Sequence, residues 1–215
     1  TDIMEDYGGM LMYSLQLEAA RNIHERMVQL DPYVPLVHHA TAALYYMLGN
    51  IELRDEHIRQ LTELAPDSWF AGGWILQQSL ETGDLDTVRQ QLDRINPQPW
   101  ASRDDLRAAA DWLQDTDQEP SPPVLRAQSF WKPLAIEAGR YDIFFQSTLA
   151  EPPNIMLSEA TQLYSPSLSP DELRRFRTHP GARELINTLR LPEYWDIVGW
   201  PDICRRVGKD DFECF

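Results

Sequence analysis

Cysteine is scarce in this 215-residue sequence, which holds only Cys204 and Cys214, both close to the C-terminus. Long apolar runs are also missing. Without about 18 consecutive apolar residues, no segment of the chain is expected to span a membrane. No signal peptide is recognisable. Because the chain begins with Thr1 rather than Met, we expect a processed or excised piece of a longer protein.

The sequence also lacks recognisable catalytic motifs. The sequence has no G-x-S-x-G nucleophile elbow, no glycine-rich phosphate loop and no H-E-x-x-H zinc motif. Adjacent histidines on a helix point about 100° apart, so His38 and His39 are not expected to share a metal. We therefore predict a non-catalytic protein with no cofactor and no metal. The histidines, expected to pack or to lie at the surface, are His24, His38, His39, His57 and His179.

Basic residues are outnumbered, with 19 Lys and Arg against 34 Asp and Glu, for a net charge of −15. A surface this negative repels phosphate backbones, which argues against direct nucleic-acid binding by this chain. The same charge disfavours docking on an anionic lipid leaflet. Membrane contact is expected only through an upstream span that this chain does not contain.

Helical periodicity is what the sequence does show. From Leu11 to about Pro97, apolar residues recur at spacings of three and four, as on one face of a helix. Gly49 and Gly83 fall where helices should end, because glycine is favoured in the left-handed conformation that follows a helix. Pro32, Pro66 and Pro97 close the successive units.

These units repeat every 34 residues, both from Pro32 to Pro66 and from Gly49 to Gly83. A helix–turn–helix with this period resembles the tetratricopeptide repeat. The small residue early in a second helix (Ala20) also matches. The repeats are degenerate: Arg54 replaces the small residue in the second unit, Leu15 replaces the turn glycine in the first, and the third unit ends early at Pro97.

The second half is helical but less periodic. Ser102 with Asp105, and Ser169 with Glu172, match helix N-caps. A proline-rich break covers 118–124. We predict an all-α fold, a helical-hairpin solenoid similar to tetratricopeptide repeats with a divergent C-terminal helical cap. Residues 1–100 hold the degenerate repeats, and 101–215 hold further helical repeats and the cap. No alternating strand pattern of useful length is present.

A binding surface is expected on the first helices of the repeats, which stack into a concave face that holds peptides or partner domains. Tyr46 and Phe70 are large aromatics suited to anchoring a partner. The alternative is that these side chains fill the groove between repeats or meet the C-terminal helices. In the repeat register the candidate residues are Leu36, His39, Ala43, Tyr46, Phe70, Gly73, Gln77 and Glu81.

The tail carries a second resemblance. Its run LRLPEYWDIVGWPDICRRVGKDDFECF is similar to the ending of helical-repeat regions in membrane-anchored winged-helix transcription regulators of the CadC/ToxR type. Related repeat regions also follow adenylate-cyclase catalytic domains. The matching residues are Leu191, Tyr194, Trp195, Gly199, Trp200, Cys204, Val207, Gly208, Asp210, Asp211, Phe212 and Cys214. The winged helix and the membrane span of that family are absent from this chain.

The two cysteines suit a staple. Val207–Gly208 permits a turn between them, so Cys204 and Cys214 can meet. Two cysteines are too few for a structural zinc, and their spacing excludes a C-x-x-C redox pair. We expect a disulfide and an oxidising compartment such as the periplasm. In a cytosolic protein the two thiols would instead be free.

Two functions follow from these resemblances. The first is a periplasmic protein-interaction or sensor domain of a membrane-bound bacterial transcription regulator. It would bind a protein or peptide partner on the repeat surface, and a homodimer is compatible with this role. The second is a cytoplasmic repeat scaffold attached to an enzyme such as an adenylate cyclase, with reduced cysteines.

Overall fold

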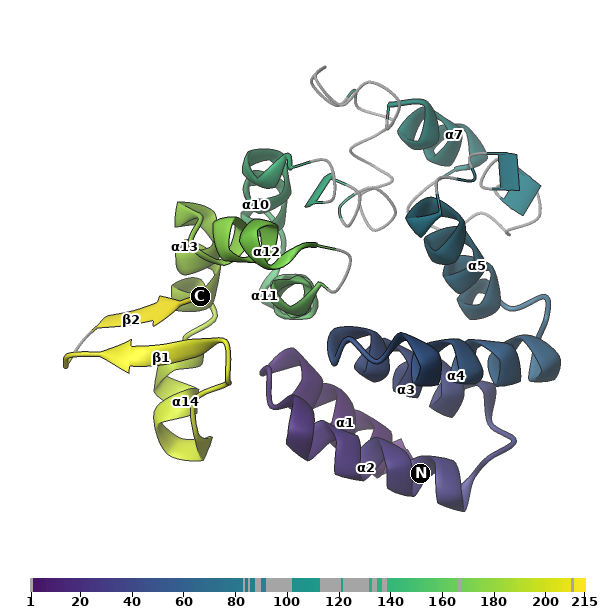
Figure 1. Ribbon diagram of the computed structural model, residues 1–215, viewed down its shortest axis with the longest axis horizontal. Coiled ribbons are helices and arrows are strands. Elements are labelled where there is room, and N and C mark those ends of the chain that lie inside the picture. The colour runs from purple at the N-terminus through teal and green to yellow at the C-terminus, as the bar shows by residue number, and fades with distance from the viewer. Residues whose placement is uncertain are drawn as a thin grey trace.

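The computed structural model confirms a mostly helical chain (Figure 1). It describes residues 2–82, 84, 86–87, 90–91, 102–112, 121, 132, 135–136, 139–165, 168–209 and 211–215. The helices are α1 (Asp2–Tyr13), α2 (Leu17–Leu30), α3 (Pro35–Met47), α4 (Ile51–Leu64), α5 (Trp69–Glu81), α7 (Arg103–Trp112), α10 (Tyr141–Leu149), α11 (Pro153–Glu159), the 3₁₀ helix η1 (Ala160–Tyr164), α12 (Pro170–Arg177), α13 (Pro180–Thr188) and α14 (Leu191–Val198). The predicted boundary at 100/101, Gly83, Pro97 and nearly all of 118–124 lie outside the described residues.

The 34-residue period is visible in the helices themselves. Helices α2 and α4 share their length and begin 34 positions apart, and so do α3 and α5. The turns repeat as well, because the same backbone hydrogen bond closes each helix before the chain reverses. These N–H to carbonyl bonds, 2.8–2.9 Å long, run from Gln16 to Leu11, from Asn50 to Tyr45 and from Asp84 to Ser79.

The turn residues explain how one unit manages without glycine. Gly49 has a φ of +69°, which confirms it as the glycine that ends α3. Leu15, 34 positions earlier, has nearly the same backbone, with a φ of 65°. That conformation costs a non-glycine residue about 1–2 kcal/mol. The Leu15 side chain is 1% exposed, and burying it gains about 1.5–3 kcal/mol, which offsets the cost.

Arg54 stands where the repeat pattern expects a small residue, and its buried charge is paired with carboxylates. Its side chain is 3% exposed, and its guanidinium pairs with Glu81 at 2.7 Å and Asp55 at 2.8 Å. Because a buried cation without partners would be strongly destabilising, these carboxylates are what permit arginine there. The pair also ties α4 to the end of α5.

The capping predictions in the second half are confirmed. The Ser102 hydroxyl accepts a hydrogen bond from the Asp105 backbone N–H at 3.2 Å, at the start of α7. Ser169 and Glu172 form a complete capping box at the start of α12. Gly139, with a φ of +73°, adopts the left-handed backbone, and its N–H donates to the Ile136 carbonyl at 2.9 Å.

One hydrophobic core joins the first repeat to the C-terminal helices. It includes Leu11 and Leu15 near the end of α1, Phe144 in α10 and Trp195 in α14. The Trp195 indole N–H donates to the Ser14 carbonyl at 2.9 Å, although 181 positions separate the two residues. The Gln16 side-chain amide also donates to the Gly199 carbonyl at 2.9 Å. The C-terminal cap therefore packs directly on the α1–α2 turn.

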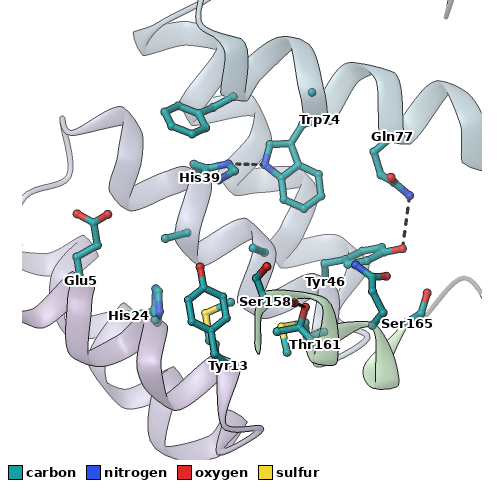
Figure 2. Close-up of a pocket in the computed structure, with 18 of the residues that line it drawn as sticks. Glu5, Tyr13, His24, His39, Tyr46, Trp74, Gln77, Ser158, Thr161 and Ser165 are labelled. Atoms are coloured by element: carbon teal, nitrogen blue, oxygen red, sulfur yellow. Dashed lines mark hydrogen bonds between the residues drawn. The ribbon is translucent and has the colours of Figure 1, made fainter. Parts of the chain in front are cut away.

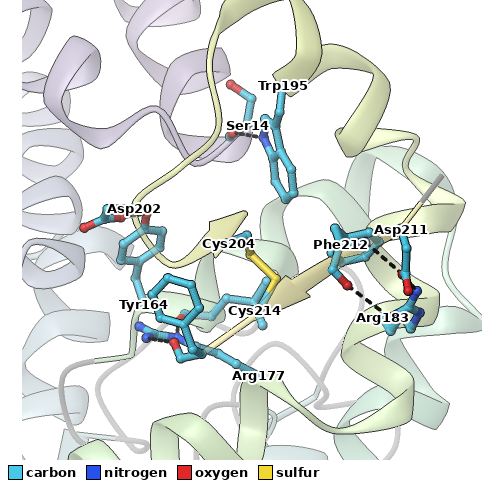
Figure 3. Close-up of a disulfide and its surroundings, with 12 residues drawn as sticks. Ser14, Tyr164, Arg177, Arg183, Trp195, Asp202, Cys204, Asp211, Phe212 and Cys214 are labelled. Atoms are coloured by element: carbon cyan, nitrogen blue, oxygen red, sulfur yellow. Dashed lines mark hydrogen bonds and ion pairs between the residues drawn. A yellow bond between two sulfur atoms is a disulfide. The ribbon is translucent and has the colours of Figure 1, made fainter. Parts of the chain in front are cut away.

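The tail differs from the predicted helical cap, because it ends in an antiparallel hairpin of strands β1 (Cys204–Val207) and β2 (Asp211–Cys214) (Figure 3). The expectation of no useful strand pattern was wrong here, since strands of four residues are too short to show a recognisable alternation. Cys204 and Cys214 face each other in the register and form a disulfide, which confirms the predicted staple. A loop of this length gives about 2–3 kcal/mol of stabilisation.

Close packing of α13 on α10 gives a sharp test of the fold. A Cβ added at Gly181 would overlap the Phe145 side chain, whereas one added at Gly73 would meet nothing within 4 Å. We predict that Gly181→Ala destabilises the protein by about 1–3 kcal/mol through overpacking. Gly73→Ala, the matched control, should stabilise it by about 0.5–1 kcal/mol through helix propensity. Urea unfolding measures both, and equal effects of the two variants would contradict the described α10–α13 contact.

Candidate functional site

A pocket of about 520 Å³ lies where the repeats meet the C-terminal segment (Figure 2). Six of the eight predicted concave-face residues line it: His39, Ala43, Tyr46, Phe70, Gly73 and Gln77. Leu36 and Glu81 do not line it, and Glu81 instead pairs with Arg54. The first helices of two repeats thus contribute one wall, on α3 and α5. Whether these residues bind a partner stays a prediction.

Two further walls complete the pocket, and the one from α1 was not predicted from the sequence. Helix α1 contributes residues that include Glu5, Asp6 and Tyr13. The segment of α11 and η1 contributes Ser158 and Thr161, which lie far along the chain from α3 and α5. The C-terminal helices thus cover the repeat face in part, as in the alternative given above, and they make the pocket three-sided.

The wall formed by α3 and α5 is aromatic, and its rings are held in place by one another. The Trp74 indole N–H donates to His39 Nδ1 at 3.1 Å, and the His39 ring packs on Phe70 with 4.3 Å between centroids. Tyr46 meets Trp74 edge-on, with 6.0 Å between centroids. Because Nδ1 accepts, the neutral His39 ring carries its proton on Nε2. Burial lowers the pKa of His39 from 6.5 to about 4, so the ring is neutral at pH 7.

His24 on α2 is the most unusual group in the pocket. Its side chain is 1% exposed, yet neither ring nitrogen makes a hydrogen bond within the described part of the chain. Burial is the main cause that lowers its pKa from 6.5 to about 4; His57 lowers it further. The nearby Gly8 carbonyl opposes this shift but lacks hydrogen-bonding geometry. An unsatisfied buried polar group costs about 1–3 kcal/mol, so His24 lacks a polar partner that the pocket can supply.

The other helical histidines have structural partners, as expected. His38 Nε2 bonds the Pro32 carbonyl at 2.8 Å, and His38 Nδ1 lies 3.0 Å from His57 Nδ1. This pair joins α3 to α4 outside the pocket. The adjacent His38 and His39 do point to different partners. Among the described residues, no group of three or more His, Cys, Asp or Glu is placed to hold a metal.

Charge around the pocket is one-sided. Among the described residues that line it, none is Lys or Arg, and the acidic ones are Glu5 and Asp6 on α1. Asp6 is exposed, which places its carboxylate in solvent. With a net charge of −15 for the chain, the pocket repels anionic ligands.

Comparison with known proteins gives no name for this arrangement: no family model, no curated protein and no solved structure matches the chain. The tetratricopeptide and regulator resemblances therefore rest on the residues quoted for them. Within the described residues, no helix is long and apolar enough to cross a membrane.

The lowered pKa of His39 predicts a pH-dependent stability. Because the folded state holds this pKa near 4, its contribution is fully present above about pH 6.5 and is lost as the pH falls toward 4. His39→Gln keeps an acceptor for Trp74 but does not titrate. Between pH 7 and pH 5 the free energy of unfolding, measured with urea, should fall in both proteins. The fall should be about 1–2 kcal/mol smaller in the variant than in the wild type. Equal losses would show that His39 is not held neutral by burial.

Proposed function

We propose that this chain is a non-catalytic helical-repeat domain that binds a ligand or partner in the pocket between its repeats and its C-terminal segment. The observation that carries the proposal is the convergence on one pocket of six candidate residues, chosen by repeat register, with the buried His24 ring, which has no hydrogen-bond partner in the described part of the chain. Concave pockets with aromatic walls and a few polar groups are typical of binding sites.

The architecture that we propose for this domain is a degenerate tetratricopeptide-like solenoid. In its support, α2 and α4 repeat with the same length and spacing, as do α3 and α5, and the same turn hydrogen bond recurs at each 34-residue step. In such arrays each hairpin contacts its neighbours, and the first helices present the binding surface. The pocket occupies that surface on α3 and α5.

The compartment we propose is oxidising, as in the periplasm. The Cys204–Cys214 disulfide supports it, because cytosolic thiols are kept reduced. Combined with the tail resemblance, this favours a sensor domain of a membrane-bound bacterial transcription regulator. A cytoplasmic scaffold attached to a cyclase would keep both thiols reduced, so the disulfide weighs against that alternative.

A sensor needs a way to turn binding into a structural change. Here the pocket walls come from α1, from the α3–α5 face and from η1. A ligand that contacts all three walls would stabilise the docking of the C-terminal segment on the repeats. Its differential affinity for the docked arrangement is what would shift the population. In a membrane-bound regulator that shift would alter pairing with a partner or with a second copy.

Filling the pocket tests this function. Gly73→Phe places a ring in the pocket, where an added Cβ has no neighbour within 4 Å. Glu52→Phe adds the same ring on an exposed part of α4, outside the pocket lining. The domain would be exported and joined through a membrane span to a dimerisation-dependent DNA-binding reporter. We expect reporter output to vary with growth medium in the wild type and the Glu52 control, and to be fixed in Gly73→Phe. A Gly73→Phe variant that folds and still responds like the wild type would contradict the proposal.

A further inference from the structure

The chemistry of the pocket specifies the kind of ligand, an inference that rests on the proposed binding function. We infer that the pocket takes an uncharged, ring-shaped ligand that carries both hydrogen-bond donors and acceptors, with His24 as its buried polar anchor. Neutral sugars and neutral heterocycles share this chemistry.

The His24 ring determines which hydrogen-bonding groups a ligand should carry. A neutral imidazole offers one N–H donor and one nitrogen acceptor. Both His24 nitrogens are buried and unpartnered among the described residues, and the ring lines the pocket (Figure 2). A Cβ added to Gly8 of α1 would lie 2.8 Å from His24 Nε2, so only glycine allows α1 this close to the ring. Because both nitrogens are covered, a ligand group reaches them only by displacing α1 slightly at Gly8, and a donor or acceptor there relieves the cost of the unsatisfied ring.

The wall formed by α11 and η1 offers acceptors. The Ser158 hydroxyl donates to the Ile155 carbonyl at 2.8 Å, and the Thr161 hydroxyl donates to the Ser158 carbonyl at 2.6 Å. With their protons committed, these two hydroxyl oxygens can only accept from a ligand. A ligand with N–H or O–H groups suits this wall.

The opposite wall favours a flat or ring-shaped face. Trp74 and Phe70 both pack on His39, and Tyr46 meets Trp74. Aromatic side chains fixed by such contacts bind rings with little loss of conformational freedom. A cavity of about 520 Å³ has room for one or two rings, within the usual range for small-molecule sites.

The interior selects against full charges of either sign. An anion would meet no Lys or Arg among the lining residues that the structure describes, and it would be repelled by Glu5 and Asp6. A cation seated at depth would give up its hydration among the uncharged side chains of His24, His39 and Trp74. The carboxylate of Asp6 is solvent-exposed and that of Glu5 is only half-buried, so they give such a cation little compensation.

Three probes of one shape and different charge test the inference: benzamide (neutral), benzamidine (cationic) and benzoate (anionic). Each is titrated into the full chain while the indole N–H signals of the tryptophans are followed by NMR. We expect benzamide to shift the Trp74 signal with a Kd of about 1 mM, and the charged probes to bind at least about tenfold more weakly. Parallel titrations with glucose, maltose, uracil and nicotinamide separate sugars from heterocycles as the source.

Variants locate the anchor. His24→Leu removes both ring nitrogens and should weaken benzamide binding about tenfold, whereas His24→Gln keeps an uncharged donor and acceptor and should retain it. His57→Leu makes the same change outside the pocket and should bind like the wild type. Circular dichroism confirms that each variant is folded, and His24→Gln keeps the test valid if His24→Leu does not fold.

The outcomes separate the ligand class from the proposed function. Tighter binding of benzamidine or benzoate at Trp74 overturns the uncharged class but leaves a binding pocket. Unchanged binding in His24→Leu overturns the anchor. If no neutral probe moves Trp74, the inference fails altogether, and the reporter response of Gly73→Phe still decides whether the pocket functions.

Discussion

The contact on which the rest of the structure depends is Trp195 against the α1–α2 turn. Its indole N–H satisfies the Ser14 carbonyl in a fully buried setting, beside Leu15 in the same core. A backbone carbonyl buried without this donor would cost about 1–3 kcal/mol. The contact fixes the position of the C-terminal cap relative to the first repeat, and so decides which surfaces the cap covers.

The disulfide-bonded tail then holds two walls of the pocket together. Asp202, just before β1, accepts a hydrogen bond from the Tyr164 hydroxyl of η1, and burial raises the Tyr164 pKa so that it remains a donor. Arg177 donates to the carbonyls of Leu163 at 2.8 Å and Phe215 at 2.7 Å. The segment that contacts α1 through Trp195 therefore also positions η1. The disulfide therefore has a structural role, because the hairpin it closes helps to position the η1 wall of the pocket.

Local signals in the sequence predicted the parts of the structure that depend on local chemistry. Gly49 and the Ser169 cap need only neighbouring residues, and the 34-residue register placed His39 and Tyr46 on one face. His24 was not recognised, because its burial depends on the close approach of α1 at Gly8. The η1 wall was foreseen only in outline, as the alternative that the repeat residues meet the C-terminal helices. Its residues could not be named, because η1 also contacts α1 and α3 more than 100 positions away, and no spacing in a single sequence reports such contacts.

Hydrogen exchange of the native protein, compared with Trp195→Phe, tests most directly whether this contact organises the pocket. Phenylalanine keeps an aromatic ring but removes the donor to Ser14. The account predicts that amide protection falls together in α1, η1 and α14, by about tenfold or more, while α4 keeps its wild-type protection. If only α14 loses protection and α1 and η1 exchange as in the wild type, the tail does not organise the pocket.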